Sequence, residues 1–186
     1  LMQAADSGGG MAAVIGLDAA AVERAVAGTG VVVANDNAPG QVVVSGPKDA
    51  LERVAAALKE AGAKRVVTLR VSAAFHSPAM RSVVPDLAAA IAAAPFSALR
   101  YTVIANVDAE PHEHAREFPA LLERQVWSPV RWVASVRRAS GEGATTFVEF
   151  GPGSVLAGLV KRILPDARTA NVSDPATLEE AAAVLR

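Results

Sequence analysis

Residues 31–44 contain two β-branched runs on either side of a segment rich in turn-forming residues. Residues 31–34 read Val-Val-Val-Ala and residues 41–44 read Gln-Val-Val-Val, and both compositions favour buried strands. The intervening residues 35–40 read Asn-Asp-Asn-Ala-Pro-Gly, which favours a turn. The pattern predicts two adjacent strands joined as a hairpin or near-hairpin.

The segments around this hairpin predict a six-element unit. Asp18 is a suitable N-cap for a helix, and Leu51, Val54 and Leu58 follow a helical spacing that puts them on one apolar face. The predicted elements are strand 11–17, helix 19–27, strands 31–34 and 41–44, a helix after Pro47 that ends at Gly62, and strand 65–71. The order β-α-β-β-α-β is the split βαβ pattern of ferredoxin-like folds.

The rest of the chain alternates helices with strands. Apolar periodicity and turn residues predict helices at 78–94, 118–126, 130–139, 154–164 and 175–186, and strands at 101–105, 145–150 and 167–172. Such alternation is typical of a parallel sheet covered by helices. Three strands are few for a complete sheet, so this half is interpreted as part of a larger α/β domain. The predicted fold class is α/β, preceded along the chain by an α+β region with the ferredoxin-like order.

Charge and composition exclude several classes of protein. The chain has 18 Lys+Arg against 19 Asp+Glu, which argues against a nucleic-acid partner. It has no Cys, so neither disulfides nor thiolate metal sites can form. No apolar run approaches the roughly 20 residues of a membrane helix, and the first residues lack a signal-peptide pattern. A cytoplasmic protein with no membrane partner is expected.

His76 is the strongest candidate for a chemical role. It lies in Phe75-His76-Ser77-Pro78, directly after a predicted strand and before a predicted helix. Loops at the ends of strands are where catalytic groups collect in α/β proteins, and an imidazole there can act as a general base. The alternative is a half-buried polar residue that caps the next helix.

Three other motifs are weaker. His112 and His114 have a spacing that can chelate a metal on a strand, but no third ligand is evident and a solvated loop is predicted. Gly151-Pro152-Gly153 precedes a helix. Such a turn can either bind a phosphate or allow the strand to pack closely on the helix. Trp127 and Trp132 are interpreted as core residues. No metal site is predicted.

Six motifs in order point to a family. They are residues 10–17 (GMAAVIGL), 34–46 (ANDNAPGQVVVSG), 71–80 (VSAAFHSPAM), 106–107 (NV), 125–132 (QVWSPVRW) and 149–163 (EFGPGSVLAGLVKRI). The chain resembles the acyltransferase family of fatty-acid and polyketide synthesis, which includes the malonyl-CoA:acyl-carrier-protein transacylases. The resemblance extends over nearly the whole chain.

The resemblance implies a fold and an activity. Members have an α/β-hydrolase-like subdomain into which a ferredoxin-like subdomain is inserted. The implied divisions are a connector at 1–9, a ferredoxin-like subdomain at 10–71 and the C-terminal part of the hydrolase-like subdomain at 72–186. The implied reaction is ping-pong transfer of malonyl from the coenzyme A thioester to the phosphopantetheine thiol of acyl carrier protein, with malonyl-CoA as substrate and no cofactor.

The resemblance also assigns roles to residues. His76 corresponds to the general base, and Gln125 to the residue whose backbone carbonyl orients the imidazole. Phe75 lies in the motif version associated with malonyl, where its bulk would crowd out an added methyl, a discrimination of about 1–3 kcal/mol. Asn35, Asn37 and Gln41 are the other implied substrate-binding residues. Lys64, Arg65, Lys161 and Arg162 are candidate contacts for an acidic carrier protein, and each is equally well a solvated charge.

The sequence lacks three features of the family: the nucleophile elbow, the arginine that pairs with the malonyl carboxylate, and the glutamine-containing oxyanion loop. The family's G-H-S-x-G nucleophile elbow is absent, so the chain is expected to supply the base but not the serine. We expect it to be inactive alone and to expose an apolar sheet edge, which predicts either poor solubility or pairing with the missing N-terminal part. That part can be upstream in the same polypeptide or a separate chain. Two alternatives stay open: an acyltransferase domain of a polyketide synthase, and a non-catalytic fragment that binds a carrier protein.

Overall fold

The computed structural model describes residues 8–184, and most of the predicted connector at 1–9 lies outside them. A four-stranded sheet is formed by β1 (Gly9–Ile15), β2 (Val32–Ala38), β3 (Gln41–Pro47) and β4 (Arg65–Thr68). The strands lie in the order β2-β3-β1-β4 and every pair is antiparallel. With α1 (Ala19–Val26) and α2 (Lys48–Glu60) between them, the predicted β-α-β-β-α-β order is observed.

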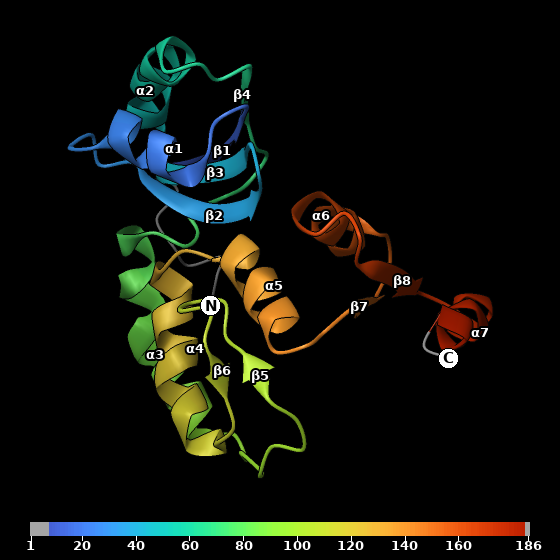
Figure 1. The fold of residues 1–186 in the computed structure, drawn as a ribbon. Helices are drawn as coiled ribbons and strands as arrows, with labels where there is room; N and C mark the ends of the chain where they lie inside the picture. The colour runs from blue at the N-terminus through green and yellow to red at the C-terminus, as the bar shows by residue number, and fades with distance from the viewer. Residues whose placement is uncertain (1–7, 185–186) are drawn as a thin grey trace.

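The alternation of side chains along the strands gives this sheet two apolar faces. Both helices cover one face (Figure 1), where Val14, Val42 and Val44 are fully buried against Val22 of α1 and Leu58 of α2. The opposite face has a smaller cluster of buried residues from three strands, against which the segment after β4 packs. Its members are Met11, Ala34 and Val43, with Leu69, Val71 and Phe75 packed on them.

The hairpin has a shorter turn than predicted. β2 continues through the Asn-Asp-Asn segment to Ala38, so only Pro39 and Gly40 separate the strands. Two register irregularities place Ala34 and Asn37 as extra residues. The extended form persists because Val130 bonds to the outer edge of β2: its N–H donates to the Ala34 carbonyl (2.8 Å) and its carbonyl accepts from the Asp36 N–H (3.0 Å).

Helices cover the Asn-Asp-Asn end of β2 from below (Figure 1). They are α5 (Trp132–Gly141) and α6 (Val155–Ile163). Ala38 of β2 is buried in one cluster with Val133 and Val136 of α5 and Val160 of α6. The predicted helix at 130–139 begins later because Val130 bonds to β2 instead.

The predicted helix at 78–94 is divided into two. Residues Pro78–Val83 form the 3₁₀ helix η2, and Val84–Ala93 form α3. Pro85 explains the break, because it has no N–H with which to continue the hydrogen bonds of the preceding turn. A further 3₁₀ turn, η3 (Ala115–Glu117), leads into α4 (Phe118–Trp127), which lies beside α3 and η2 (Figure 1).

The predicted three-stranded parallel sheet is only partly correct. β7 (Thr146–Phe150) and β8 (Arg168–Val172) are parallel neighbours, and α7 (Pro175–Val184) follows. β5 (Val103–Ile104) instead pairs with β6 (Pro111–His112), antiparallel. The intervening turn closes this hairpin, because the Ala105 N–H donates to Glu110 and the Ala109 N–H donates to Ala105. None of the helices within residues 8–184 is long and apolar enough to cross a membrane.

Candidate active site around His76

His76 occupies a tight turn between β4 and η2. Its φ of 55° lies in the left-handed region, which is uncommon for a residue with a side chain. Ser77 holds the turn: its buried hydroxyl donates to the Ala74 carbonyl at 2.6 Å and accepts from the Ala79 N–H at 3.3 Å. The turn therefore leads into a 3₁₀ helix that Ser77 caps. The hydrogen bonds of Ser77 offset the backbone strain at His76.

The imidazole of His76 contacts Gln125, near the end of α4. Its Nδ1 lies 3.1 Å from the Gln125 backbone carbonyl oxygen. That carbonyl is in the last turn of the helix, where no intrahelical donor remains for it. A carbonyl can only accept, so Nδ1 carries the proton and donates it. The other ring nitrogen, Nε2, is then unprotonated in the neutral imidazole.

The side-chain amide of Gln125 also lies near the imidazole. Its Nε2 is 3.5 Å from His76 Nδ1 and 3.3 Å from the Ser128 carbonyl. A protonated Nδ1 cannot accept a hydrogen bond, so in this tautomer the amide donates to the Ser128 carbonyl and not to His76. The Gln125 Oε1 is buried without a hydrogen-bond partner in the part of the chain that the structure describes.

An apolar cluster surrounds this pair. Ala73, Met80 and Val83 are buried, and Phe75, Val126 and Trp127 pack against them. Phe75 belongs to this cluster and also to the cluster beneath the four-stranded sheet. Its ring therefore links the turn of His76 to the sheet that carries the hairpin.

Three of the predicted substrate-binding residues, Asn35, Asn37 and Gln41, lie on that hairpin. Asn35 and Asn37 are half-buried, and their side chains make no hydrogen bond to residues 8–184. Gln41 differs, because its side-chain oxygen accepts from Arg162 of α6. Ala34 and Phe75 share one cluster, so the segments that carry Asn35 and His76 adjoin.

The predicted solvated loop at His112 is wrong. His112 lies in β6 with its side chain only 12% exposed, and its ring nitrogens face Glu117 (3.2 Å) and Asp108 (3.3 Å). Burial lowers the pKa of His112, but hydrogen bonds to Glu117 and Asp108 outweigh it and raise the pKa above its ordinary value. His114 is exposed, as expected of a loop residue.

No metal cluster is formed by this segment. Among residues 8–184, no three His, Asp or Glu side chains are grouped so as to hold a metal ion. The two carboxylates at His112 act instead as hydrogen-bond acceptors that tie the β5–β6 hairpin to η3.

The glycine-rich turn after β7 serves packing rather than a phosphate. The Asn171 side-chain amide donates to the carbonyls of Glu149, Gly151 and Gly153, which holds the turn closed. The Glu149 carboxylate accepts from the Ala157 N–H (2.8 Å) in the first turn of α6. A carboxylate therefore already occupies the end of the helix where a phosphate would bind.

Both tryptophans have the predicted packing role. Trp132 packs on the cluster beneath β2, and Trp127 packs beside Met80. Sequence reasoning missed three other contacts: Arg81 lies over Trp127, Arg162 bonds to Gln41, and Ser77 closes the His76 turn. The first two join segments far apart in the chain, so no local pattern signals them. For the third, the Ser-Pro pair after His76 is typical of a helix start.

Fold and site together define an α/β protein whose loop histidine is oriented by a backbone carbonyl. Residues 1–178 match the family described as the acyl transferase domain. The chain therefore belongs to the acyl transferase domain family.

Individual relatives agree with this assignment. The chain is 41% identical over 177 residues to the malonyl CoA-acyl carrier protein transacylase of Salmonella typhimurium, a match that covers 93% of this chain and 57% of that protein. It is 42% identical over 168 residues to the polyketide biosynthesis protein ThaF of Burkholderia thailandensis, covering 89% of this chain and 14% of ThaF.

A solved structure has the same fold. It is a malonyl-transacylase in complex with a type II PKS acyl-carrier protein; the TM-score is 0.90 at 37% identity, and the match covers 96% of this chain and 59% of that one. The chain thus spans less than two thirds of the length of the transacylases that it matches.

Proposed function

We propose that this chain is the C-terminal part of an acyltransferase that moves malonyl from malonyl-CoA to the phosphopantetheine thiol of acyl carrier protein. The names of the Salmonella relative and of the carrier-bound transacylase support the substrate and the acceptor. The single observation that carries the proposal is the bond between His76 Nδ1 and the Gln125 carbonyl, because it leaves Nε2 free to accept a proton.

In the proposed mechanism His76 moves one proton in each half-reaction. Nε2 takes the proton of a serine hydroxyl as its oxygen attacks the malonyl thioester, and then gives that proton to the departing coenzyme A thiolate. In the second half-reaction Nε2 takes the proton of the carrier thiol, and returns it to the serine when the ester breaks. The Gln125 carbonyl stabilises the imidazolium formed in between, and no cofactor is needed.

The proposed substrate contacts come from two segments. Asn35 and Asn37 have side-chain amides free for a ligand, and Gln41 lies at the other side of the same turn. Phe75 would limit the space beside the acyl group, which favours malonyl over a methyl-branched analogue. The limited space around Phe75 is supported by its packing between two apolar clusters.

The proposed serine belongs to an N-terminal part, either upstream in a longer polypeptide or on a companion chain. We assign residues 10–71 to a ferredoxin-like subdomain and 72–186 to the C-terminal part of an α/β-hydrolase-like subdomain. Several large apolar side chains near β7 and α6 support a missing neighbour: Phe150 is 75% exposed and Val155 is 71% exposed. A cytoplasmic location remains a prediction.

The proposal is tested by intact mass of the protein isolated from its source, with any companion chain, before and after malonyl-CoA. A malonyl adduct on the longer polypeptide or on the companion is expected. Substitution His76→Ala should abolish adduct formation and transfer to carrier protein, whereas His114→Ala on the exposed loop should change neither. An adduct that forms at the normal rate on His76→Ala would contradict the proposal.

A polyketide synthase domain is the second candidate, favoured by the 42% identity to ThaF. Coding sequence upstream of residue 1 separates the two, since a ketosynthase there would place the chain in a synthase. A non-catalytic fragment that binds the carrier protein predicts binding without any adduct. Charge reversal at Lys64 or Arg65, the candidate contacts on the first subdomain, tests that binding directly.

A further inference from the structure

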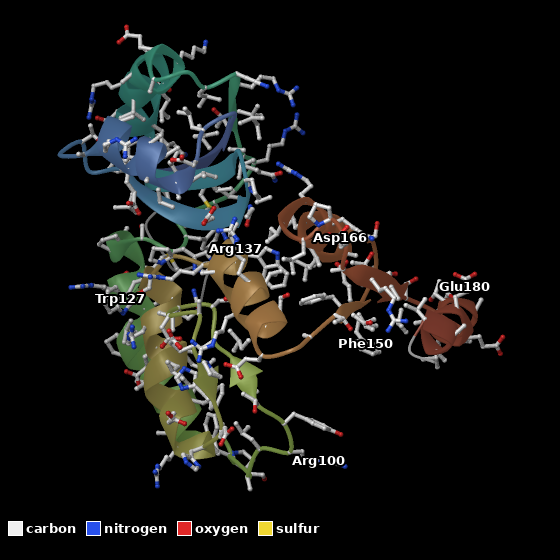
Figure 2. The ribbon with its side chains drawn as sticks, in the orientation of Figure 1. Arg100, Trp127, Arg137, Phe150, Asp166 and Glu180 are labelled. Carbon is white, nitrogen blue, oxygen red and sulfur yellow. The ribbon has the colours of Figure 1, made fainter. Side chains whose placement is uncertain are left out.

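Arg81 and Trp127 form a stacked pair beside His76. The guanidinium carbon of Arg81 lies 4.1 Å from the centre of the Trp127 ring, within the range of a cation–π contact. Arg81 is in η2 and Trp127 is the last residue of α4. Figure 2 labels Trp127, at the end of α4 that contacts η2.

The stack joins the same two segments as the His76–Gln125 hydrogen bond. η2 begins two residues after His76, and Trp127 follows Gln125 by two residues. Met80 and Val83 of η2 also pack with Trp127. The contact between the two segments therefore combines apolar packing with the cation–π contact of Arg81. A shift of η2 along α4 would therefore move His76 relative to the Gln125 carbonyl.

This hydrogen bond needs external support. His76 has a left-handed backbone, which is costly for a residue with a side chain. Gln125 lies in the final turn of α4, where helices fray. His76 lies outside regular secondary structure and Gln125 lies in the last turn of α4, so a contact that joins η2 to the end of α4 helps to hold the 3.1 Å distance.

We propose that Arg81 and Trp127 are positioning residues that keep His76 in the tautomer protonated on Nδ1. The catalytic consequence, a permanently available Nε2, rests on the proposed function; the effect on the tautomer does not. The pair acts through the imidazole and touches no reacting atom.

The test is the tautomer of His76, read from the ring nitrogen shifts of the ¹⁵N-labelled 186-residue chain by NMR. The spectrum is recorded at about pH 8.5, above the ordinary titration range of histidine. The wild-type chain is expected to show one tautomer, protonated on Nδ1. Arg81→Met and Trp127→Leu are expected to show a mixture of both tautomers, while circular dichroism remains that of the wild-type fold.

Matched variants distinguish loss of the Arg81–Trp127 stack from a general loosening of the packing around His76. Trp127→Phe keeps an aromatic face and should retain the single tautomer that Trp127→Leu loses. Ser82→Ala removes a hydroxyl of η2 that only bonds to Ala79 (3.3 Å) and should have no effect. Arg116→Met controls for loss of an exposed charge.

Two outcomes would overturn the proposal. One is an unchanged single tautomer in folded Arg81→Met or Trp127→Leu, and the other is a tautomer mixture in the wild-type chain. If Arg81→Met does not fold, the Trp127→Phe and Trp127→Leu pair gives the answer. The two proposals can fail separately. If no malonyl adduct forms but the His76 tautomer still depends on Arg81, the proposed function is refuted and the positioning role is not.

Discussion

Arg162 of α6 donates to the side-chain oxygen of Gln41 at the start of β3, 121 residues earlier in the chain. The same guanidinium donates to the Pro39 carbonyl at 3.0 Å. A helix of the second half thereby holds the turn between β2 and β3. Since this turn follows Asn37, the contact links α6 to the hairpin that we propose binds substrate.

Loss of this contact should loosen the turn. Arg162→Ala is expected to speed amide hydrogen exchange at Gly40 and Gln41, and to lower the free energy of unfolding by about 1 kcal/mol or less, as for an exposed pair. Lys161→Ala is the matched control, because the Lys161 amine bonds only to the Pro165 carbonyl at 3.4 Å. Equal exchange at Gly40 in both variants would show that Arg162 does not hold the turn.

Ser77→Ala should destabilise the turn of His76. The substitution removes the bond to the Ala74 carbonyl and the cap on the Ala79 N–H, in a side chain that is 2% exposed. We expect a loss of about 1–2 kcal/mol, measured by urea denaturation. Ser82→Ala, which alters an exposed hydroxyl nearby, should lie within about 0.5 kcal/mol of wild type. A Ser77→Ala chain as stable as wild type would exclude this role.

Gly9→Ala should strain the contact between β1 and the segment before His76. A Cβ at this position would lie 2.7 Å from the Ala74 Cβ and 2.8 Å from the Ala74 nitrogen. One of the two backbones must move, at a cost of about 1–3 kcal/mol in thermal or urea unfolding. Gly141→Ala at the end of α5 meets no atom within 4 Å, so it should be neutral or stabilising. Comparable losses in both variants would rule out the close approach as the cause.

His112 should make stability depend on pH. Because hydrogen bonds to Glu117 and Asp108 raise its pKa on folding, the protonated form is favoured in the folded chain. This contribution is complete below the ordinary pKa of about 6.5 and is lost as pH rises through the folded value. The free energy of unfolding of wild type relative to His112→Gln should therefore fall as pH rises above about 6.5.

The control for this prediction is Glu113→Gln. Glu113 is exposed beside His112 and a glutamate carboxyl does not titrate above about pH 6.5, so its substitution should leave the pH dependence unchanged. If the difference in unfolding free energy between wild type and His112→Gln does not change with pH, the two carboxylates do not favour the imidazolium.

Phe150→Ser should make the isolated chain less prone to aggregate. The Phe150 side chain is 75% exposed at the end of β7, so its removal costs little packing and reduces an apolar patch. We expect a lower aggregated fraction in light scattering, with a midpoint of unfolding close to wild type. Phe147→Ser, in the same strand but packed on the cluster beneath β2, should instead unfold more easily. Unchanged aggregation would show that this surface is not the one responsible.

Local patterns in the sequence determined most of the helices and strands. Leu51, Val54 and Leu58 predicted the buried face of α2, and all three are buried there. The valines on either side of the Asn-Asp-Asn segment predicted both strands of the hairpin. These features follow from contacts within one turn or one strand, so a short stretch of sequence is sufficient to specify them.

Tertiary structure decided where the elements end and what they bond to. β2 continues through Asn-Asp-Asn because Val130, far along the chain, supplies its hydrogen bonds. β5 pairs with β6, and His112 is buried between two carboxylates, because of a turn that periodicity does not detect. For the site, sequence and family resemblance identified His76 and Gln125. The 3.1 Å between them, and the Arg81–Trp127 stack beside them, depend on packing between segments about 50 residues apart, which no local pattern encodes.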